Sequence, residues 1–312
     1  MSQVTGKPPV VWLLDDQKPG HRSQLKGLGN RLRVLCGANL HWLDATTIPV
    51  PVWRALFGLA PRLDLPRPDL IIAAGRRSHR LLLSLRRLRG ARTLVLMKPG
   101  FPLSWVDGAI IPAHDGVPER DGVLVSEGAL NAMTPMARLT DKPEALILLG
   151  GPSPHYEWDN DRVLQQVTQL IQNYRDWRWT ISGSRRTPPE LQAELEALAG
   201  PRITVVDHSR THQDWLSHTL AGCRAAWVTP DSVSMVYEVL TAGLPTGLFE
   251  LPPRQPGRVV SGIEALLERG RVASWQDHAR IMQRRGQEAA PLWEADRAAR
   301  WVIQRFLGGG ER

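Results

Sequence analysis

The sequence has few cysteines and no long hydrophobic run. Only Cys36 and Cys223 occur among its 312 residues, and neither has neighbours at the spacing of a metal site. We therefore expect both to be small buried hydrophobic residues. No window reaches the ~18 apolar residues without charge that a membrane-spanning helix needs. Residues 1–9 hold no long apolar stretch before a cleavage site, which predicts no secretory signal and a cytoplasmic protein that adheres to a membrane.

Acidic residues are scarce in the first part of the chain. Residues 1–140 contain 19 Lys and Arg but only 10 Asp and Glu, whereas residues 141–312 contain 20 and 21, so the formal net charge of +8 arises in the first part. Such a basic surface favours an anionic partner, either nucleic acid or a membrane. The sequence lacks a helix-turn-helix, zinc or RNA-recognition motif, and its cations are not interleaved with stacking aromatic residues. We expect no nucleic-acid partner.

The pattern of apolar residues predicts an α/β fold. With 42% hydrophobic and 22% charged residues, the chain is long enough for two folded domains. Short apolar runs alternate with helical patterns, which is typical of parallel sheets. The predicted strands cover residues 10–14, 70–74, 93–97, 108–111, 145–149, 177–181, 203–206, 225–228 and 246–249. The predicted helices cover residues 22–35, 78–88, 161–175, 189–198, 232–242 and 291–307.

Residues 140–143, Thr-Asp-Lys-Pro, predict a hinge. The expected architecture is two doubly wound, Rossmann-like domains, 1–140 and 141–290, that face a cleft. The final segment, 291–312, should form a helix that packs back on the first domain. In such sheets ligands bind beyond the carboxyl ends of the strands, so functional residues should follow the apolar runs directly. Tryptophans 12, 179 and 227 fall inside strands, where we expect them in the core.

One candidate catalytic residue follows the first strand. The polar turn at residues 15–24 ends where a helix begins, which places His21 at the carboxyl edge of the sheet. A histidine with an ordinary pKa of ~6.5 can accept a proton from a hydroxyl group near neutral pH. A helix-capping histidine is the alternative.

Two turns in the second domain have the composition of phosphate sites. Gly150 and Gly151 follow a strand, and glycines let a ligand approach backbone N–H groups closely. The turn is neither a P-loop nor a dinucleotide fingerprint, so a plain strand-to-helix turn is the alternative. The next strand runs into hydroxyl residues and Arg185-Arg186, whose planar forks fit phosphate. A solvated basic loop would have the same composition.

A third turn leads into a helix that begins near Asp231 or Ser232. If Ser232 caps it, the free N–H groups of the helix start face the ligand. Glu238 follows Ser234 by four positions and shares its face, where a carboxylate can bind a ribose diol. An ordinary surface glutamate is the alternative.

Two basic stretches of the first domain suggest contact with lipid. Seven arginines without an acidic residue occupy residues 76–92, a run that is usually a solvated helix face. Residues 50–59 mix apolar side chains with arginine, the composition of a helix on anionic lipid. A packed interdomain helix is an equal alternative for residues 50–59.

These segments together resemble the mitochondrial-fission protein family of plants and bacteria, whose fold is glycosyltransferase-like, of the GT-B type. The resemblance spans nearly the whole chain. In the first half it rests on Pro19-Gly20-His21, Ala74-Gly75-Arg76-Arg77, His114-Asp115 and Gly128-Ala129-Leu130-Asn131. In the second half it rests on Gly150-Gly151-Pro152-Ser153, Ser182 with Arg185-Arg186-Thr187-Pro188, and Thr229-Pro230-Asp231-Ser232-Val233-Ser234-Met235 with Glu238.

The resemblance implies that the second domain binds a nucleotide-sugar donor, UDP-linked or linked to another nucleoside diphosphate, without a metal ion or further cofactor. It places Gly150, Gly151 and Ser153 at the diphosphate, with Ser182, Arg185 and Thr229 assisting and residues Asp231, Ser232, Ser234 and Met235 giving a helix N-terminus. Glu238 would hold the ribose. His21, with His114 or Asp115 as substitute, would deprotonate the acceptor hydroxyl.

The implied function is a metal-independent glycosyltransferase that modifies a lipid-linked acceptor, such as a lipopolysaccharide core, at the inner membrane. The sequence departs from the family pattern at residues 97–100 and at Ala113, both in the acceptor-binding domain. A catalytically inactive GT-B scaffold that binds a membrane or a protein partner is the alternative.

Overall fold

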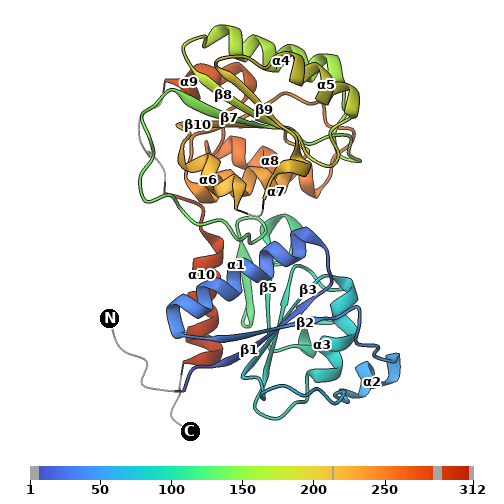
Figure 1. Cartoon of the computed structure of the whole chain (residues 1–312). Helices are drawn as coiled ribbons and strands as arrows, with labels where there is room; N and C mark the ends of the chain where they lie inside the picture. Colours follow the sequence, from blue (N-terminus) through green and yellow to red (C-terminus); the bar gives the residue numbers. More distant parts are fainter. Residues whose placement is uncertain (1–6, 213, 284–289, 309–312) are drawn as a thin grey trace. The chain divides into compact units, whose positions relative to one another are not determined.

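The computed structural model describes residues 7–212, 214–283 and 290–308. The chain divides into two compact units (Figure 1): unit 1 contains Met1–Ala132 and Trp293–Arg312, and unit 2 contains Met133–Leu292. The segment 133–140, which the sequence analysis assigned to the first domain, groups with unit 2. Residues 1–6 belong to the segment where we expected no secretory signal, and residues 309–312 belong to the expected C-terminal segment. Both ranges lie outside the described residues.

Unit 1 contains a six-stranded parallel sheet in the order β2-β1-β3-β4-β5-β6. Its strands are β1 (Val10–Asp15), β2 (Asn39–Asp44), β3 (Leu70–Ala74), β4 (Arg92–Leu96), β5 (Gly108–Pro112) and β6 (Val123–Ser126). Its α-helices are α1 (Pro19–Cys36), α2 (Val52–Phe57), α3 (His79–Leu85) and α10 (Glu294–Val302). Strand β1 is buried on both faces, because Val11 and Leu13 pack with α1 and α10 while Trp12 and Leu14 pack with α3. Burial on both faces explains the continuous apolar run in its sequence.

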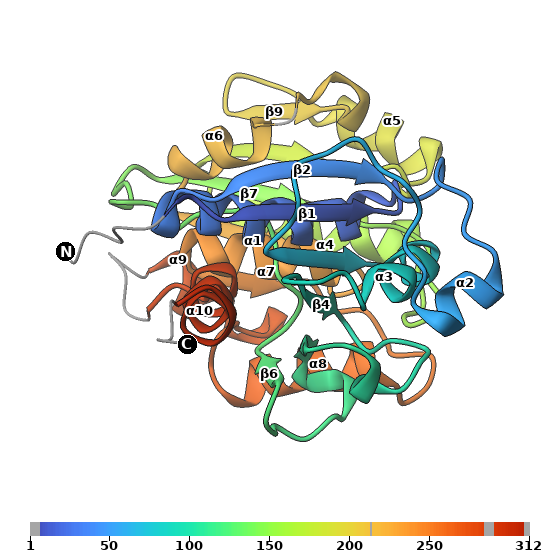
Figure 2. The same cartoon turned by 90° about the horizontal axis from the view of Figure 1, so that it is seen from below.

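Helix α10 packs against α1, from which it is far apart in the sequence (Figure 2). Arg31 of α1 donates its Nε proton to Asp296 Oδ1 at 2.9 Å, and its guanidinium lies 4.2 Å from the ring centre of Trp293. The small residues Ala298 and Ala299 are fully buried, which lets the two helices approach closely. The end of the chain is thereby part of the core of unit 1.

Unit 2 contains a five-stranded parallel sheet in the order β11-β10-β7-β8-β9. Its strands are β7 (Glu144–Leu148), β8 (Arg178–Ser182), β9 (Ile203–Val206), β10 (Ala225–Val228) and β11 (Thr246–Leu248). Its helices are α4 (Asn160–Asn173), α5 (Pro189–Ala197), α6 (Trp215–Ala221), α7 (Val233–Ala242), α8 (Arg258–Glu268) and α9 (His278–Met282). Two parallel α/β sheets confirm the predicted fold class.

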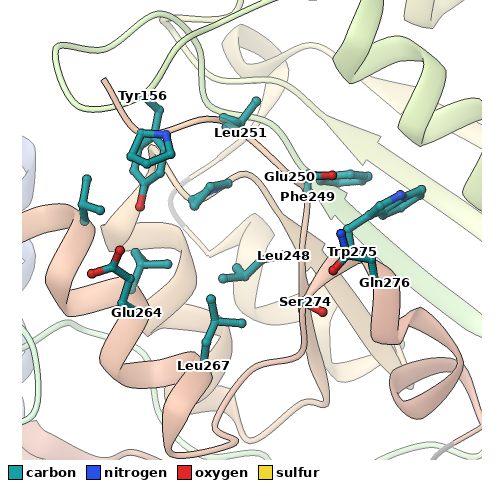
Figure 3. A pocket seen from close by; sticks show the side chains of 14 residues that line it. Tyr156, Leu248, Phe249, Glu250, Leu251, Glu264, Leu267, Ser274, Trp275 and Gln276 are labelled. Carbon is teal, nitrogen blue, oxygen red and sulfur yellow. The ribbon is translucent and has the colours of Figure 1, made fainter. Parts of the chain in front are cut away.

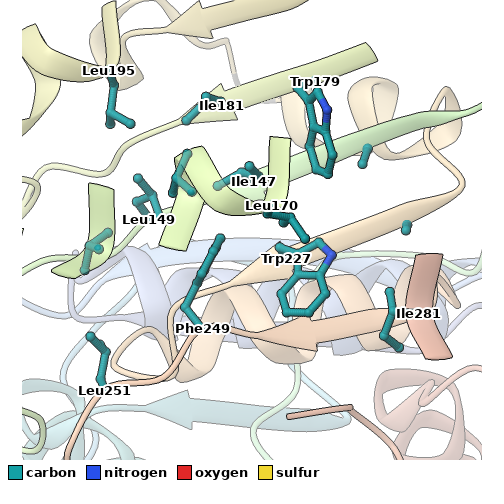
Figure 4. Packing of buried hydrophobic residues seen from close by; sticks show 14 of the residues in the cluster. Ile147, Leu149, Leu170, Trp179, Ile181, Leu195, Trp227, Phe249, Leu251 and Ile281 are labelled. Carbon is teal, nitrogen blue, oxygen red and sulfur yellow. The ribbon is translucent and has the colours of Figure 1, made fainter. Parts of the chain in front are cut away.

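Aromatic and aliphatic side chains together fill one face of the sheet in unit 2 (Figure 4). Trp227 is fully buried and contacts Phe249 at a ring-centre distance of 5.7 Å, while its indole N–H donates to Met282 Sδ at 3.3 Å. Gly247 lies against the same indole, so that a Cβ there would be 2.6 Å from the ring. Tryptophans 12, 179 and 227 are all buried, which confirms their predicted place in the core.

The two cysteines differ in environment. Cys223 is buried and free, as expected, and burial raises its thiol pKa to about 12. Cys36 is only half-buried, so the expectation of full burial is wrong there: it sits at the end of α1, where its thiol donates to Leu32 O at 3.1 Å. None of the helices in the described part of the chain is both long and apolar enough to cross a bilayer.

Candidate functional site

A histidine–carboxylate pair lies at the carboxyl end of β1 in unit 1. His21, in the first turn of α1, has its Nδ1 2.8 Å from Oδ1 of Asp16. The Asp16 side chain is 1% exposed, whereas that of His21 is 21% exposed. When Nδ1–H donates to the carboxylate, the tautomer is fixed and Nε2 is left as the proton acceptor. The pair therefore has the geometry of a general base with its positioning residue.

Gly75 provides the space for this pair. It directly follows β3, the neighbour of β1, and has a φ of +86°, in the left-handed region that favours glycine. A Cβ at this position would lie 2.1 Å from Asp16 Oδ2 and 2.2 Å from His21 Nδ1. Asp16 Oδ2 is buried and has no hydrogen-bond partner among the described residues. Any side chain at position 75 would displace the pair.

His79 extends this cluster. It begins α3, and burial together with the positive charge of Arg76 lowers its pKa, against the opposite influence of Asp16. Its ring packs edge-on against Phe101 at 5.0 Å. A neutral imidazole beside the pair adds no charge that would compete with His21 for a proton.

The other two candidate catalytic residues lie elsewhere on the same edge. His114 and Asp115 form a short 3₁₀ turn after β5, three strand positions away from β1. Since neighbouring strands are ~4.8 Å apart, the two strand ends are separated by roughly 14 Å. Asp115 Oδ2 accepts the backbone N–H of Lys98 at 3.4 Å, so the loop that departs from the family pattern contacts this turn. The role of either residue as a substitute for His21 stays a prediction.

In unit 2 the loops after β7, β8 and β10 are bonded to one another. Gly150 N donates to Thr229 Oγ1 at 2.7 Å, and Gly151 N donates to Asp231 Oδ2 at 3.1 Å. Both glycines are buried. This differs from the expectation that their N–H groups receive phosphate oxygens, because the protein itself already provides the acceptors.

Arg186 completes this link. Its Nη2 lies 2.8 Å from Asp231 Oδ2, and its Nη1 donates to Gly151 O at 3.1 Å. Burial raises the pKa of Asp231, while Gly151 N–H and Arg186 lower it. Asp231 and Arg186 therefore act as a structural pair that fixes three loops, and Arg186 is not a free cation.

The remaining donor-site candidates differ in availability. Ser153 Oγ accepts the N–H groups of His155 and Tyr156, both at 3.3 Å, so it closes its own turn. Ser182 is buried, and its hydroxyl donates to Gly183 O at 3.2 Å. Arg185 is exposed and has no partner among the residues that the structure describes. Of the charged candidates, Arg185 is the one that can reach a new anion.

The start of α7 has unsatisfied donors. Ser232 is the N-cap residue, but its side chain makes no capping bond. Within the described ranges, no acceptor bonds the N–H groups of the first three helical residues, Val233, Ser234 and Met235. Such N–H groups and the positive end of the helix dipole attract an anion. Ser234, on the first turn, is exposed.

Glu238 lies one turn further along α7, below Ser234. It is partly buried, has no hydrogen-bond or ion-pair partner in the described part of the chain, and burial raises its pKa to about 7. A carboxylate that is desolvated without compensation is costly, and the cost is offset when a ligand donates hydrogen bonds to it. Its position on the same face as Ser234 places an acceptor beside the anion-binding turn.

A pocket of about 220 Å³ lies beside these loops, lined in part by Pro230, the residue before Asp231 (Figure 3). Its walls are largely apolar, with Phe249 and Trp275 stacked at 5.7 Å. The Tyr156 hydroxyl and the Glu264 carboxylate point into it. Burial, with the negative charge of Glu264, raises the pKa of Tyr156, so the phenol stays a hydrogen-bond donor at all physiological pH values.

A substitution at Gly151 tests the close approach of the loops after β7 and β8. A Cβ at this position would lie 2.0 Å from the carbonyl oxygen of Arg186, so the backbone must move. We expect Gly151→Ala to lower the free energy of unfolding by about 1–3 kcal/mol, measured by urea denaturation. The control is Gly257→Ala, where the nearest atom to a Cβ is 4.0 Å away. Equal stability of both variants would contradict the close approach.

Sequence reasoning assigned no role to Asp16 or Gly75, and it interpreted Arg186 as a phosphate-binding cation, whereas the structure pairs Arg186 with Asp231. All three lie in segments that the sequence analysis singled out, but a separation of five residues does not by itself predict contact between Asp16 and His21. Among the described residues, no three His, Cys, Asp or Glu side chains gather into a group that could hold a metal ion.

Comparisons with known proteins agree with this architecture. The sequence model of the mitochondrial fission ELM1 family matches residues 19–306. No curated protein matches the sequence. A putative UDP-N-acetylglucosamine 2-epimerase from Listeria monocytogenes is similar in structure, with a TM-score of 0.60, 11% identity and 95% of each chain covered.

Two further solved structures are similar over 96% of this chain and 99% of their own. One is the UDP-GlcNAc 2-epimerase from Neisseria meningitidis bound to UDP-GlcNAc, with a TM-score of 0.53 and 8% identity. The other is described as the glycotransferase of kitacinnamycin, with a TM-score of 0.50 and 11% identity. At such identities the likeness concerns the fold, and it confirms the predicted GT-B-like class.

Proposed function

Because the chain belongs to the mitochondrial fission ELM1 family and has a GT-B-like fold, we propose that it is a metal-independent glycosyltransferase. It moves a sugar from a nucleoside-diphosphate donor to a lipid-linked acceptor of the cell envelope, such as a lipopolysaccharide core, at the inner membrane. The observation that carries the proposal is the start of α7, where three unsatisfied N–H groups precede a partly buried carboxylate without a partner.

The free N–H groups at the start of α7 match the diphosphate of a nucleoside diphosphate, and Glu238 matches its ribose. The N–H groups of residues 233–235 receive phosphate oxygens, with Arg185 as the additional cation. Glu238 accepts hydrogen bonds from the ribose hydroxyls, which compensates for its desolvation. Gly150, Gly151, Thr229 and Asp231 hold the loops in place and contribute through shape, since the two glycine N–H groups are bonded to Thr229 Oγ1 and Asp231 Oδ2.

In the proposed reaction, His21 accepts the proton of the acceptor hydroxyl group. The acceptor hydroxyl oxygen attacks the anomeric carbon, its proton passes to His21 Nε2, and the bond between that carbon and the diphosphate oxygen breaks with the electron pair leaving on the nucleoside diphosphate. Asp16 stabilises the imidazolium that forms. The leaving group gains negative charge in the transition state, so N–H dipoles and Arg185 aimed at it lower the barrier.

The charge distribution supports a lipid-linked acceptor. The positive charge of the chain is concentrated in residues 1–140, which form most of unit 1 and include His21. An anionic membrane attracts basic residues near its surface by about 1 kcal/mol each, within a Debye length of ~10 Å. Binding to the membrane would bring the basic unit to its substrate.

Nucleotide binding is the first test. In a thermal-shift panel of nucleoside diphosphates and nucleotide sugars, we expect at least one to raise the melting temperature, because a ligand that binds only the folded state stabilises it. The similar Neisseria epimerase is described as bound to UDP-GlcNAc, so UDP and UDP-GlcNAc are the first probes. Arg185→Ala should weaken binding about tenfold, or about 1.4 kcal/mol.

Arg178→Ala is the matched control, since Arg178 is an exposed arginine at the opposite end of the same strand, β8. No stabilisation by any nucleotide would favour the catalytically inactive scaffold. Conversion of UDP-GlcNAc to its epimer without an acceptor would replace sugar transfer by epimerisation. Equal loss of affinity in both arginine variants would argue against a phosphate at the end of β8.

A further inference from the structure

Most of the exposed large apolar side chains in the described residues belong to one short segment of unit 1. Of eight such side chains, six lie within residues 52–65, with 37–61% of their surface exposed. We call these six the α2 patch: Val52, Trp53, Leu56, Phe57, Leu59 and Leu65. The other two, Val34 and Trp42, lie on α1 and β2.

Helix α2 is anchored to the core of unit 1 on one side, so its exposed apolar side chains belong to a packed helix. Ala55 is buried in the same core cluster as the leucines of α3. Arg86, just after α3, donates to the carbonyl oxygens of Ala55 and Leu56, the latter at 2.6 Å. Figure 2 shows α2 beside α3 at the rim of unit 1. The anchor fixes the helix with its remaining apolar side chains outward.

The C-terminus of α2 is fixed as well. Gly58 ends the helix with a φ of +65°, and a Cβ there would lie 2.9 Å from the aliphatic stem of Arg87. The arginine stem therefore packs beneath the turn while its charged head remains exposed.

The surroundings of the α2 patch are strongly basic. Residues 52–92 contain ten arginines and two aspartates. Arg62 and Arg67 are exposed and lie near the patch in sequence, and Arg87 is exposed and packs against Gly58. The guanidinium of Arg54 lies 5.3 Å from the ring centre of Trp53. Aromatic and aliphatic side chains beside cations suit the boundary between anionic headgroups and acyl chains.

The composition of the patch also favours a membrane over a protein. Its aromatic and aliphatic side chains stand beside exposed arginines, a combination that suits an anionic bilayer surface. A bilayer needs no complementary shape. We propose that the α2 patch inserts into the surface of an anionic bilayer, with the neighbouring arginines bound to lipid phosphates.

This inference deepens the proposed function, because it names the surface that brings a transferase to a membrane-linked acceptor. The insertion of the α2 patch into a bilayer does not require transferase activity, and only its biological purpose rests on the proposed function. Vesicle binding and nucleotide binding are separate measurements, so the failure of one is distinguishable from the failure of the other.

The test is cosedimentation of the full chain with vesicles of phosphatidylcholine alone or of equal parts phosphatidylcholine and phosphatidylglycerol. These vesicles contain no glycolipid, so binding reports the bilayer surface and not an acceptor. We expect binding to the anionic vesicles that weakens with salt, and at least a tenfold loss for the double variant Trp53→Ala, Phe57→Ala. The matched control is Val34→Ala, Trp42→Ala, which removes the exposed apolar side chains outside the patch and should bind as wild type.

The change in melting temperature that a nucleotide causes in the wild type, whatever its size, should be the same in the double variant Trp53→Ala, Phe57→Ala. The melting temperature of this variant without ligand shows that the variant is folded. Failure of the wild type to bind anionic vesicles would overturn the inference, as would equal binding by the wild type and this variant. A wild-type dimer in light scattering that the variant converts to a monomer would assign the patch to a second copy of the chain instead.

Discussion

Replacement of His21 by asparagine should slow sugar transfer by about 10²–10⁴-fold, the usual contribution of a positioned general base. The donor should bind as before, because His21 is not among the residues proposed to hold the diphosphate and the ribose. The measurement is release of the nucleoside diphosphate from the donor identified by thermal shift, with an envelope lipid extract as the source of acceptor.

Two related variants separate chemistry from position. Asp16→Asn keeps the shape but can fix the wrong tautomer of His21, so turnover should fall and its pH profile should change while the melting temperature stays close to wild type. Gly75→Ala should reduce turnover as well, because its Cβ would lie 2.2 Å from His21 Nδ1. His41→Asn, a partly exposed histidine on β2, is the control. Turnover that survives the loss of His21 would refute the assignment of the base.

Replacement of Glu238 by glutamine should stabilise the protein at high pH while weakening donor binding at least tenfold. The carboxyl pKa is raised from 4.5 to about 7 in the folded protein. The folded state therefore binds more protons than the unfolded state across this window, and wild-type stability falls as the pH rises through it. Glutamine has no charge to desolvate, so the variant should lack this slope.

The expected gain in the free energy of unfolding is about 1–3 kcal/mol at pH 8 and smaller at pH 5. Urea denaturation at both pH values measures it. Glu194→Gln, at an exposed position on α5, should change neither stability nor donor affinity. A Glu238→Gln variant that binds the donor as tightly as wild type would show that this carboxylate does not hold the ribose.

The apolar runs determined most of the fold. All nine predicted strands overlap observed ones, because strands buried on both faces leave an uninterrupted apolar signal. The two strands that the sequence analysis missed, β2 and β6, form the edges of the sheet in unit 1. Strand β2 is largely exposed and mixes polar with apolar residues, so its pattern resembles a loop. This reason does not apply to β6, whose residues Val123–Ser126 are mostly buried.

The positions of the candidate sites in the chain could be predicted from the sequence, but the contacts within the sites could not. The turns after the strands are where the analysis placed them, yet which groups remain available depends on neighbours that are distant in the sequence. Gly150 and Gly151 have the composition of a phosphate loop, but Thr229 and Asp231, about 80 residues away, accept their N–H groups.

The sequence by itself therefore determined the family, the parallel α/β architecture and the concentration of positive charge in the first part of the chain, because each follows from residue order and composition. Only the tertiary structure decided that Asp16 orients His21, that Arg186 is neutralised by Asp231, and that the apolar face of α2 is left uncovered. Hydrogen bonds and burial depend on which segments become neighbours after folding, and local sequence carries no record of that.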